Sequence, residues 1–394
     1  MLVIGTLSLV ASPASAQQAR LYQLGGGFLG GGKVEASVVR RENYFYESSG
    51  GISATGYRVR PEVMVNRAGS IATLALDAFL EHSRYDLPGT LDEYMDYGTN
   101  GSLSWRPLTK HGFELSAGYL RGHDQPGLLR TEEGPQLNAR DIDEWESTRL
   151  GLSYRYGSPS SLASNELSVG ARSREYVSNR ADTQLLNYDG VQLGYQLSYA
   201  YSPKTSVLFT VGHSSTNYEI GTLANGNSRD GNELAVRTGL RWVATGKTSG
   251  QILIGARSYS VDGRARPARE GFSWRANFDW SPLDTTTLRL STSQSTTETF
   301  RNDTLFIDDR GLDASWRQVW SERFNTTLKA GYVNSDFVGT DRTDETFNLS
   351  AGASYLLLRT VNLFGEYVSQ QRQSTRAGRD YTAPEARVGL RWTP

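Results

Sequence analysis

The chain has 394 residues, a formal net charge of −1 and no cysteine. The lack of cysteine excludes disulfides, thiolate metal sites and cysteine nucleophiles. A near-neutral charge gives no reason to expect attraction to nucleic acid or anionic lipid. After the N-terminus, no apolar stretch approaches the ~20 residues that a membrane helix requires.

The N-terminal segment has the pattern of a secretory signal. Residues 1–11 are mostly apolar, and Ala14-Ser15-Ala16 is the small-x-small pattern of a cleavage site. We expect a signal peptide over residues 1–16 and a flexible periplasmic leader over residues 17–32. The run Gly25 to Gly30 formally matches GxGxxG, but it follows no predicted strand and precedes no helix, so it is not read as a dinucleotide site.

The rest of the chain, residues 33–392, repeats one unit. An alternating apolar and polar stretch is followed by a tight turn, a second such stretch and a longer polar loop, which predicts β-hairpins. The predicted strands cover residues 33–45, 55–66, 70–82, 96–106, 111–122, 145–156, 164–176, 188–201, 205–217, 232–244, 248–261, 270–280, 285–297, 309–320, 323–336, 343–357, 360–372 and 380–392.

One face of each predicted strand is apolar and almost free of charge. Leu193, Tyr195 and Leu197 alternate with Gln192 and Gln196, for example. A charged residue on a lipid-facing surface costs roughly 2–4 kcal/mol at the midplane of the bilayer. The alternation therefore predicts a lipid-facing side.

The alternative, a soluble β-sandwich, has strands of about five or six residues, whereas these match the ~9–11 residues that cross a membrane. An aromatic residue commonly precedes the tight turns, as Trp105, Tyr156, Tyr201 and Trp280 do, where a membrane boundary would place it. We predict an all-β fold, a transmembrane antiparallel up-and-down β-barrel of about 18 strands. An even strand number would place both termini in the periplasm.

The opposite strand face carries many charges and would line the lumen. A cationic wall that favours anionic or hydroxyl-rich solutes is one interpretation. The other is that arginines and carboxylates pair across strands and only stiffen the wall. The candidate pore-lining residues are Arg58, Arg60, Arg172, Arg237, Arg241, Arg275, Arg289, Arg317, Lys329, Arg387, Arg391, Glu114, Asp279 and Glu366.

The longest predicted loop, residues 122–144, is polar and acidic. It is either a constriction folded into the lumen or a solvated surface loop. The candidate constriction residues are Asp124, Arg130, Glu132, Glu133 and Arg140.

No pattern of residues predicts catalysis. The histidines His82, His111, His123 and His213 are scattered without paired ligand spacing. We therefore expect no enzyme activity, no metal site and no cofactor.

Two hairpins and the C-terminal strand carry a family resemblance. They contain Tyr201-Ser-Pro-Lys-Thr, Trp280-Ser-Pro-Leu-Asp and Arg387-Val-Gly-Leu-Arg-Trp392. From about Lys33 onward the sequence resembles the outer-membrane barrels of the "putative β-barrel porin 2" type, a family found with exopolysaccharide synthesis and export genes. The resemblance implies an outer-membrane location in a Gram-negative bacterium.

The resemblance also implies a channel for a secreted exopolysaccharide. Its partners would be outer-membrane lipid, the polysaccharide substrate and a periplasmic polysaccharide-export protein, with no nucleic acid. Two alternatives stay open. One is a general diffusion porin for small polar solutes, and the other is a plugged structural or adhesive barrel that acts through its extracellular loops.

Overall fold

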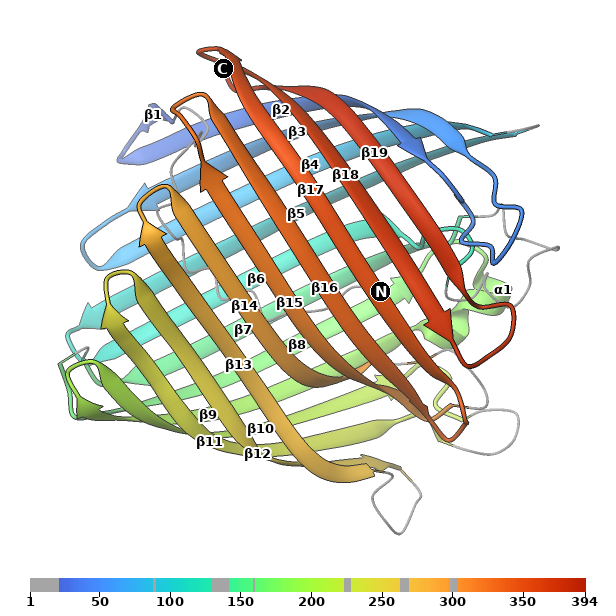
Figure 1. Ribbon diagram of the computed structural model, residues 1–394. Helices are drawn as coiled ribbons and strands as arrows, with labels where there is room; N and C mark the ends of the chain where they lie inside the picture. The colour runs from blue at the N-terminus through green and yellow to red at the C-terminus, as the bar shows by residue number, and fades with distance from the viewer. Residues whose placement is uncertain are drawn as a thin grey trace.

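The protein is a single large β-barrel in the computed structural model (Figure 1). The structure describes residues 21–87, 90–128, 142–158, 160–222, 228–262, 269–297, 299 and 304–394. Within that part, no helix has the length and apolarity to cross a bilayer. The predicted signal peptide, residues 1–16, lies outside the described residues.

The described part of the chain forms nineteen strands and two short helices. They are β1 (Tyr22–Gly25), β2 (Phe28–Arg41), β3 (Ala54–Ala68), β4 (Ala72–Leu87), β5 (Thr90–Leu108), β6 (His111–His123), β7 (Glu144–Tyr156), β8 (Ala163–Tyr176), α1 (Arg180–Thr183), η2 (Gln184–Leu186), β9 (Tyr188–Ser202), β10 (Thr205–Tyr218), β11 (Gly231–Thr245), β12 (Thr248–Val261), β13 (Arg269–Leu283), β14 (Thr286–Thr297), β15 (Phe306–Val319), β16 (Phe324–Val338), β17 (Thr343–Leu358), β18 (Val361–Ser374) and β19 (Tyr381–Trp392).

The ladder is closed. Each strand from β2 to β19 pairs antiparallel with its neighbours in the sequence, and β19 pairs with β2 from Glu385↔Arg41 to Trp392↔Val34. The predicted 18-stranded antiparallel barrel is therefore confirmed. Closure satisfies the backbone N–H and C=O groups that lipid cannot bind.

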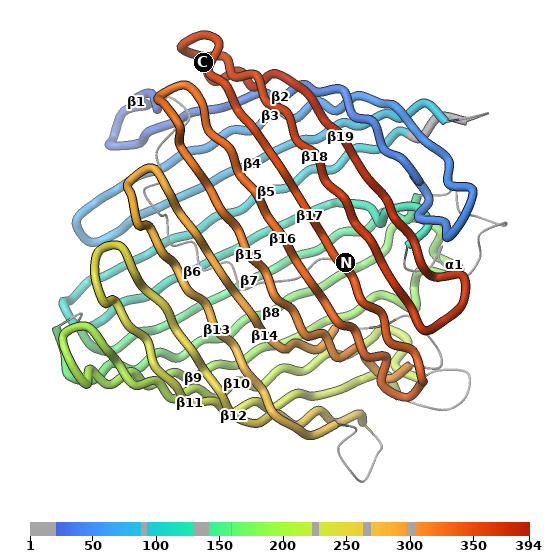
Figure 2. Tube along the Cα trace, in the orientation of Figure 1, coloured from blue at the N-terminus to red at the C-terminus, as the bar shows by residue number. Residues whose placement is uncertain are grey.

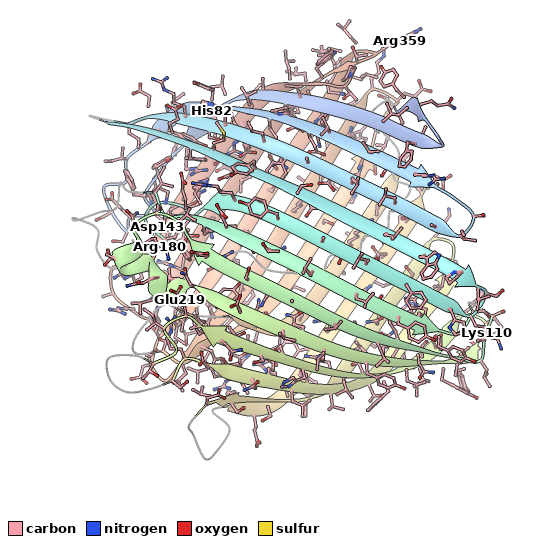
Figure 3. All side chains as sticks on the ribbon, turned by 180° about the vertical axis from the view of Figure 1, so that it is seen from behind. His82, Lys110, Asp143, Arg180, Glu219 and Arg359 are labelled. Carbon is pink, nitrogen blue, oxygen red and sulfur yellow. The ribbon has the colours of Figure 1, made fainter. Side chains whose placement is uncertain are left out.

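The two ends of the barrel differ in their connections (Figure 2). At one end, here called the short-turn end, turns of two to six residues join consecutive strands. At the other, the long-loop end, the longest connection has 20 residues, from 124 to 143. β2 begins and β19 finishes at the short-turn end. Figure 3 labels Lys110 and Arg359 at the short-turn end, and Asp143, Arg180 and Glu219 at the long-loop end.

Side chains alternate between the outside and the inside of the wall, as predicted. On β11, Leu234, Val236 and Leu240 are between 38% and 47% exposed on the outer face. Arg237 and Arg241 occupy the alternate positions and point inward. The aromatic residues before the short turns, among them Trp105, Tyr156, Tyr201 and Trp280, are also exposed, as expected of a ring at a membrane boundary.

The barrel begins earlier than predicted. The sequence predicted a flexible leader up to residue 32 and a first strand over residues 33–45, but β2 already begins at Phe28 and ends at Arg41. The short β1 folds back on it through Gly25, Gly26 and Gly27, whose φ angles of +90°, +60° and +79° favour glycine. The glycine run is thus a hairpin turn.

A second difference concerns residues 83–95, which were predicted to be a loop. β4 and β5 instead stay paired up to Leu87↔Thr90, so their hairpin extends well past the predicted strand ends. The prediction stopped too early because these residues lack an apolar outer face: Arg84 and Glu93 occupy outward positions there. A β-ladder needs an apolar outer face only where lipid surrounds it, so paired strands can continue beyond the membrane without one.

An outward and an inward position on β9 provide a test of the lipid-facing surface. Leu193, near the middle of the strand, is 50% exposed on the outer face, whereas Gln196 points inward. We expect Leu193→Arg to lower the free energy of unfolding in phospholipid vesicles by about 2–4 kcal/mol. The matched control Gln196→Arg should lower it by less than about 1 kcal/mol. Equal losses would show that both faces meet the same solvent.

Candidate functional site

The candidate site is the inner face of the barrel wall. All fourteen candidate pore-lining residues occupy strand positions that alternate with the exposed apolar side chains. Their role in lining a solute path stays a prediction. They are Arg58 and Arg60 on β3, Glu114 on β6, Arg172 on β8, Arg237 and Arg241 on β11, Arg275 and Asp279 on β13, Arg289 on β14, Arg317 on β15, Lys329 on β16, Glu366 on β18, and Arg387 and Arg391 on β19.

On one side of the lumen, which β2 to β4, β18 and β19 form, cations are paired with carboxylates. It is called the paired side below. Lys33 Nζ lies 3.1 Å from Glu62 Oε2, and Arg58 Nε lies 3.3 Å from Glu81 Oε1. These pairs join neighbouring strands across the ladder, which agrees with the interpretation that such ion pairs stiffen the wall. Further pairs of this kind are Arg60–Glu81, Arg387–Glu366, Arg391–Glu35 and Arg41–Glu385.

On the other side, from β7 to β13, several arginines have no carboxylate partner in the part of the chain that the structure describes. Arg149 lies directly opposite Arg172 in the β7–β8 ladder. Arg237 donates from Nε to Ser273 Oγ at 2.8 Å, and Arg241 donates from Nε to Gln251 Oε1 at 3.1 Å. Among the described residues, no carboxylate oxygen lies within 4.0 Å of the guanidinium groups of Arg149, Arg237, Arg241 or Arg275. This side therefore has a net positive charge.

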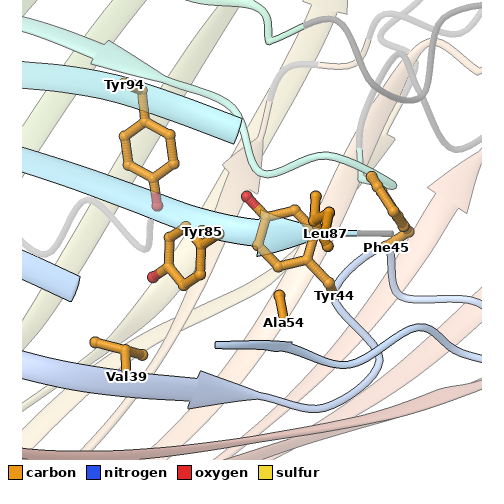
Figure 4. Packing of buried hydrophobic residues seen from close by; sticks show 7 residues of the cluster. All are labelled: Val39, Tyr44, Phe45, Ala54, Tyr85, Leu87 and Tyr94. Atoms are coloured by element: carbon orange, nitrogen blue, oxygen red, sulfur yellow. The ribbon is translucent and has the colours of Figure 1, made fainter. Parts of the chain in front are cut away.

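The paired side is also narrowed at the long-loop end. Tyr44 and Phe45 of the β2–β3 connection fold against the inner wall, where they pack with Tyr85 and Tyr94 (Figure 4). The ring centroids of Tyr44 and Tyr85 are 5.2 Å apart, and those of Tyr44 and Phe45 are 5.1 Å apart. This cluster was not predicted, because the alternating pattern placed Tyr44 and Phe45 in a strand. Three consecutive aromatic residues beside a Ser-Gly-Gly segment were the available signal.

The predicted constriction loop begins inside the barrel. Asp124 accepts hydrogen bonds from Trp145 Nε1 at 2.9 Å and from Tyr176 Oη at 2.8 Å. The next residue, Gln125, accepts a hydrogen bond from Arg41 on β2. The start of the loop thus joins β7 and β8 to the paired side of the wall. The other candidate constriction residues, Arg130, Glu132, Glu133 and Arg140, lie outside the described residues.

A second narrowing of the lumen comes from the ends of β14 and β15. No sequence pattern indicated it. Thr296 donates to Glu233 on β11, and Asp308 forms an ion pair with Arg257 on β12. Phe306 packs against Tyr259 with the rings tilted, their centroids 4.1 Å apart. These strand ends therefore lie against the inner face of β11 and β12.

Loops at the long-loop end bridge the two narrowings. Arg229, in the β10–β11 connection, donates to the carbonyl oxygens of Leu185 and Thr299. Asn187 donates to Glu219 Oε2 at 2.6 Å, and Asn179 donates to Asp143 Oδ1 at 2.7 Å. The described parts of these loops are therefore held to one another.

A family comparison fits this architecture. The family described as "Putative beta-barrel porin 2" matches residues 160–393, more than half of the chain. The chain belongs to this family. It is thus a porin-like outer-membrane β-barrel, and the association with exopolysaccharide genes remains untested.

Three solved structures are similar to this porin-like barrel. Pseudomonas aeruginosa OccK7 (OpdD) is 10% identical, with a TM-score of 0.46 and coverage of 93% of this chain and 98% of that chain. Pseudomonas aeruginosa OpdQ is 11% identical, with a TM-score of 0.48 and coverage of 92% and 98%. The siderophore receptor PiuA from Acinetobacter baumannii is 9% identical, with a TM-score of 0.44 and coverage of 92% and 82%. A comparison with curated protein sequences finds no match.

The lumen of this porin-like barrel also has a polar recess near the short-turn end. Its lining combines arginines, carboxylates, an amide and several serine hydroxyls from β5 to β11. Arg155 is paired with Glu166, while Arg241 reaches the same recess from β11. Such a surface can hydrogen-bond hydroxyl or carboxylate groups of a solute in passing. Polar residues that line the recess include Ser104, Glu114, Ser153, Arg155, Glu166, Gln196 and Arg241.

The pH dependence of stability tests whether Asp124 is buried at the start of the predicted constriction loop. Burial raises the pKa of Asp124, and the hydrogen bonds from Tyr176 and Trp145 oppose this shift only in part. A raised pKa means that the carboxylate destabilises the fold above that pKa, and that the destabilisation is relieved as the pH falls through it. We expect Asp124→Asn to raise the thermal unfolding midpoint at pH 7.5, and this advantage to shrink at pH 5. A pH-independent difference between the two proteins in detergent would contradict this assignment.

Proposed function

We propose that the chain is a diffusion channel for small polar solutes, with a preference for anions. The observation that carries the proposal is that, among the described residues, the inward Arg149, Arg237, Arg241 and Arg275 have no carboxylate within ion-pairing distance. In a confined lumen such charges raise the local concentration of anions. The description of the family as a porin supports the same reading.

Export of an exopolysaccharide, which the sequence resemblance implied, has weaker support. A polymer strand would have to pass inward-folded residues on two sides of the long-loop end, Tyr44 and Phe45 on one side and Phe306 and Asp308 on the other. Small solutes need less space. The periplasmic export partner, the plugged barrel acting through its loops and the periplasmic location of the termini remain predictions.

Ion selectivity tests the charge argument. In a planar bilayer with a KCl gradient, we expect a reversal potential that corresponds to chloride passing more readily than potassium. The triple change Arg149→Gln, Arg237→Gln and Arg275→Gln should shift this potential toward or beyond zero, because it removes three inward charges without leaving a carboxylate unpaired. The matched triple change to lysine keeps the charges and should keep the potential. A wild-type channel that prefers potassium would refute the anion preference.

Solute size separates a diffusion channel from an exporter. Proteoliposomes that contain the barrel should swell in isotonic solutions of a pentose or a small sugar acid, and the rate should fall steeply for oligosaccharides. Liposomes without protein provide the baseline. If a long polysaccharide entered as readily as a pentose, the export interpretation would be preferred. An absence of swelling with every solute would support the plugged barrel.

A further inference from the structure

The pairing between β13 and β14 is the shortest of the barrel. It begins at Arg275↔Ser293 and contains seven residue pairs, whereas the closing pairing between β19 and β2 contains eight. Residues 269–274 of β13 pair with β12 on one edge and, among the strands that the structure describes, with none on the other. Gln294 to Thr297 of β14 likewise pair only with β15. Two consecutive strands of the wall, β13 and β14, therefore each keep an unpaired edge.

The wall overlaps itself at this point. Gln294, Thr296 and Asp308 occupy even-numbered positions of β14 and β15, the same parity as the outward-facing Leu290 and Leu312. Thr296 nevertheless contacts Glu233 and Asp308 contacts Arg257, and both partners belong to the inner face of β11 and β12. The outer face of one strand pair thus lies on the inner face of the preceding strands, inside the lumen.

A buried ion pair holds the overlap. The side chains of Arg257 and Asp308 are 2% and 0% exposed. Gln294 donates to Asp308 Oδ1 at 2.9 Å, and Arg257 Nη1 lies 3.5 Å from Glu233 Oε2. If Asp308 lost its charge, Arg257 would keep only this longer contact with a carboxylate, and an underpaired buried charge is costly.

A second arrangement is available to the same strands. Continuing the β13–β14 register by one residue at a time would pair Trp274 with Gln294, Ser273 with Ser295, and Phe272 with Thr296. The backbone groups of both edges would then be satisfied, as a lipid-exposed barrel requires. The contacts of Thr296 with Glu233 and of Asp308 with Arg257 would then be lost. Each arrangement satisfies one set of polar groups and leaves another unsatisfied, which is the energetic condition for a two-state element.

We propose that the overlapping ends of β14 and β15 are a gate in the barrel wall. In the arrangement described here the overlap occupies the lumen beside β11 and β12, and the Arg257–Asp308 pair keeps it there. When the pair breaks, β14 joins β13 along the continued register and the overlap leaves the lumen. The channel then has a wider passage at the long-loop end.

Single-channel recordings test the role of the ion pair. Asp308→Asn should increase the fraction of time spent in a higher conductance level by about tenfold or more, because it removes the main charge partner of Arg257. The matched control is Glu175→Gln, which removes a carboxylate partner of the exposed Arg180, 2.8 Å away and outside the overlap. It should change that fraction by less than about twofold. Equal effects of the two variants would overturn the proposal.

Cross-linking tests the second arrangement without depending on conduction. The chain has no cysteine, so paired cysteines can be introduced without a background. With a short bifunctional thiol reagent in membranes, Thr296→Cys should link to Glu233→Cys in the overlapped arrangement and to Phe272→Cys in the joined one. The control pair is Phe272→Cys with Ser295→Cys, which would point to opposite faces of the wall and should not link.

The proposal predicts both Thr296 links in a folded barrel, with the Phe272 link increased by Asp308→Asn. Folding is checked by the migration shift of the unheated protein on a gel. If Thr296→Cys links to Glu233→Cys and never to Phe272→Cys, with or without Asp308→Asn, the overlap is fixed and the gate is refuted. If the Asp308 variant does not fold, the two cysteine pairs in the otherwise unchanged chain decide the question in the same way.

Discussion

The closed backbone ladder is the constraint on which the rest of the structure depends. Lipid offers no hydrogen-bond partner, so every N–H and C=O group within the bilayer has to be satisfied by a neighbouring strand. The pairing of β19 with β2 closes the ladder, although the β13–β14 pairing stops short of the strand ends. Because side chains alternate along a paired strand, closure also separates the apolar residues, which face lipid, from the charged residues, which face the lumen.

The lumen is not uniform, and its asymmetry follows from how its charges are neutralised. On β2 to β4 and β18 to β19, cations such as Lys33 and Arg391 have carboxylate partners on an adjacent strand. On β7 to β13, arginines such as Arg237 bind neutral groups instead. Paired charges contribute mainly rigidity, whereas the others leave a positive potential for a passing solute. The narrowing at the long-loop end limits the size of the solutes that can follow this path.

Much of the wall could be predicted from the sequence, because each strand carries its own evidence. The alternation around Leu193 and Gln196 and the aromatic residue before many of the tight turns are local signals. The extended β4–β5 hairpin was missed because Arg84 and Glu93 lie outward beyond the apolar surface. The contacts of Arg257 with Asp308 and of Arg41 with Gln125 join residues 51 and 84 positions apart. No local pattern distinguishes such inward-folded residues from ordinary wall or loop residues.

Accessibility along one strand tests the account most directly. Single cysteines placed at successive positions from Val236 to Trp242 on β11 can be probed in membranes with a water-soluble thiol reagent and with a quencher dissolved in the lipid. The account predicts a strict period of two: even positions respond to the lipid-borne quencher, and odd positions such as Arg237 and Arg241 react with the water-soluble reagent. Uniform access to water on both faces of β11 would contradict it.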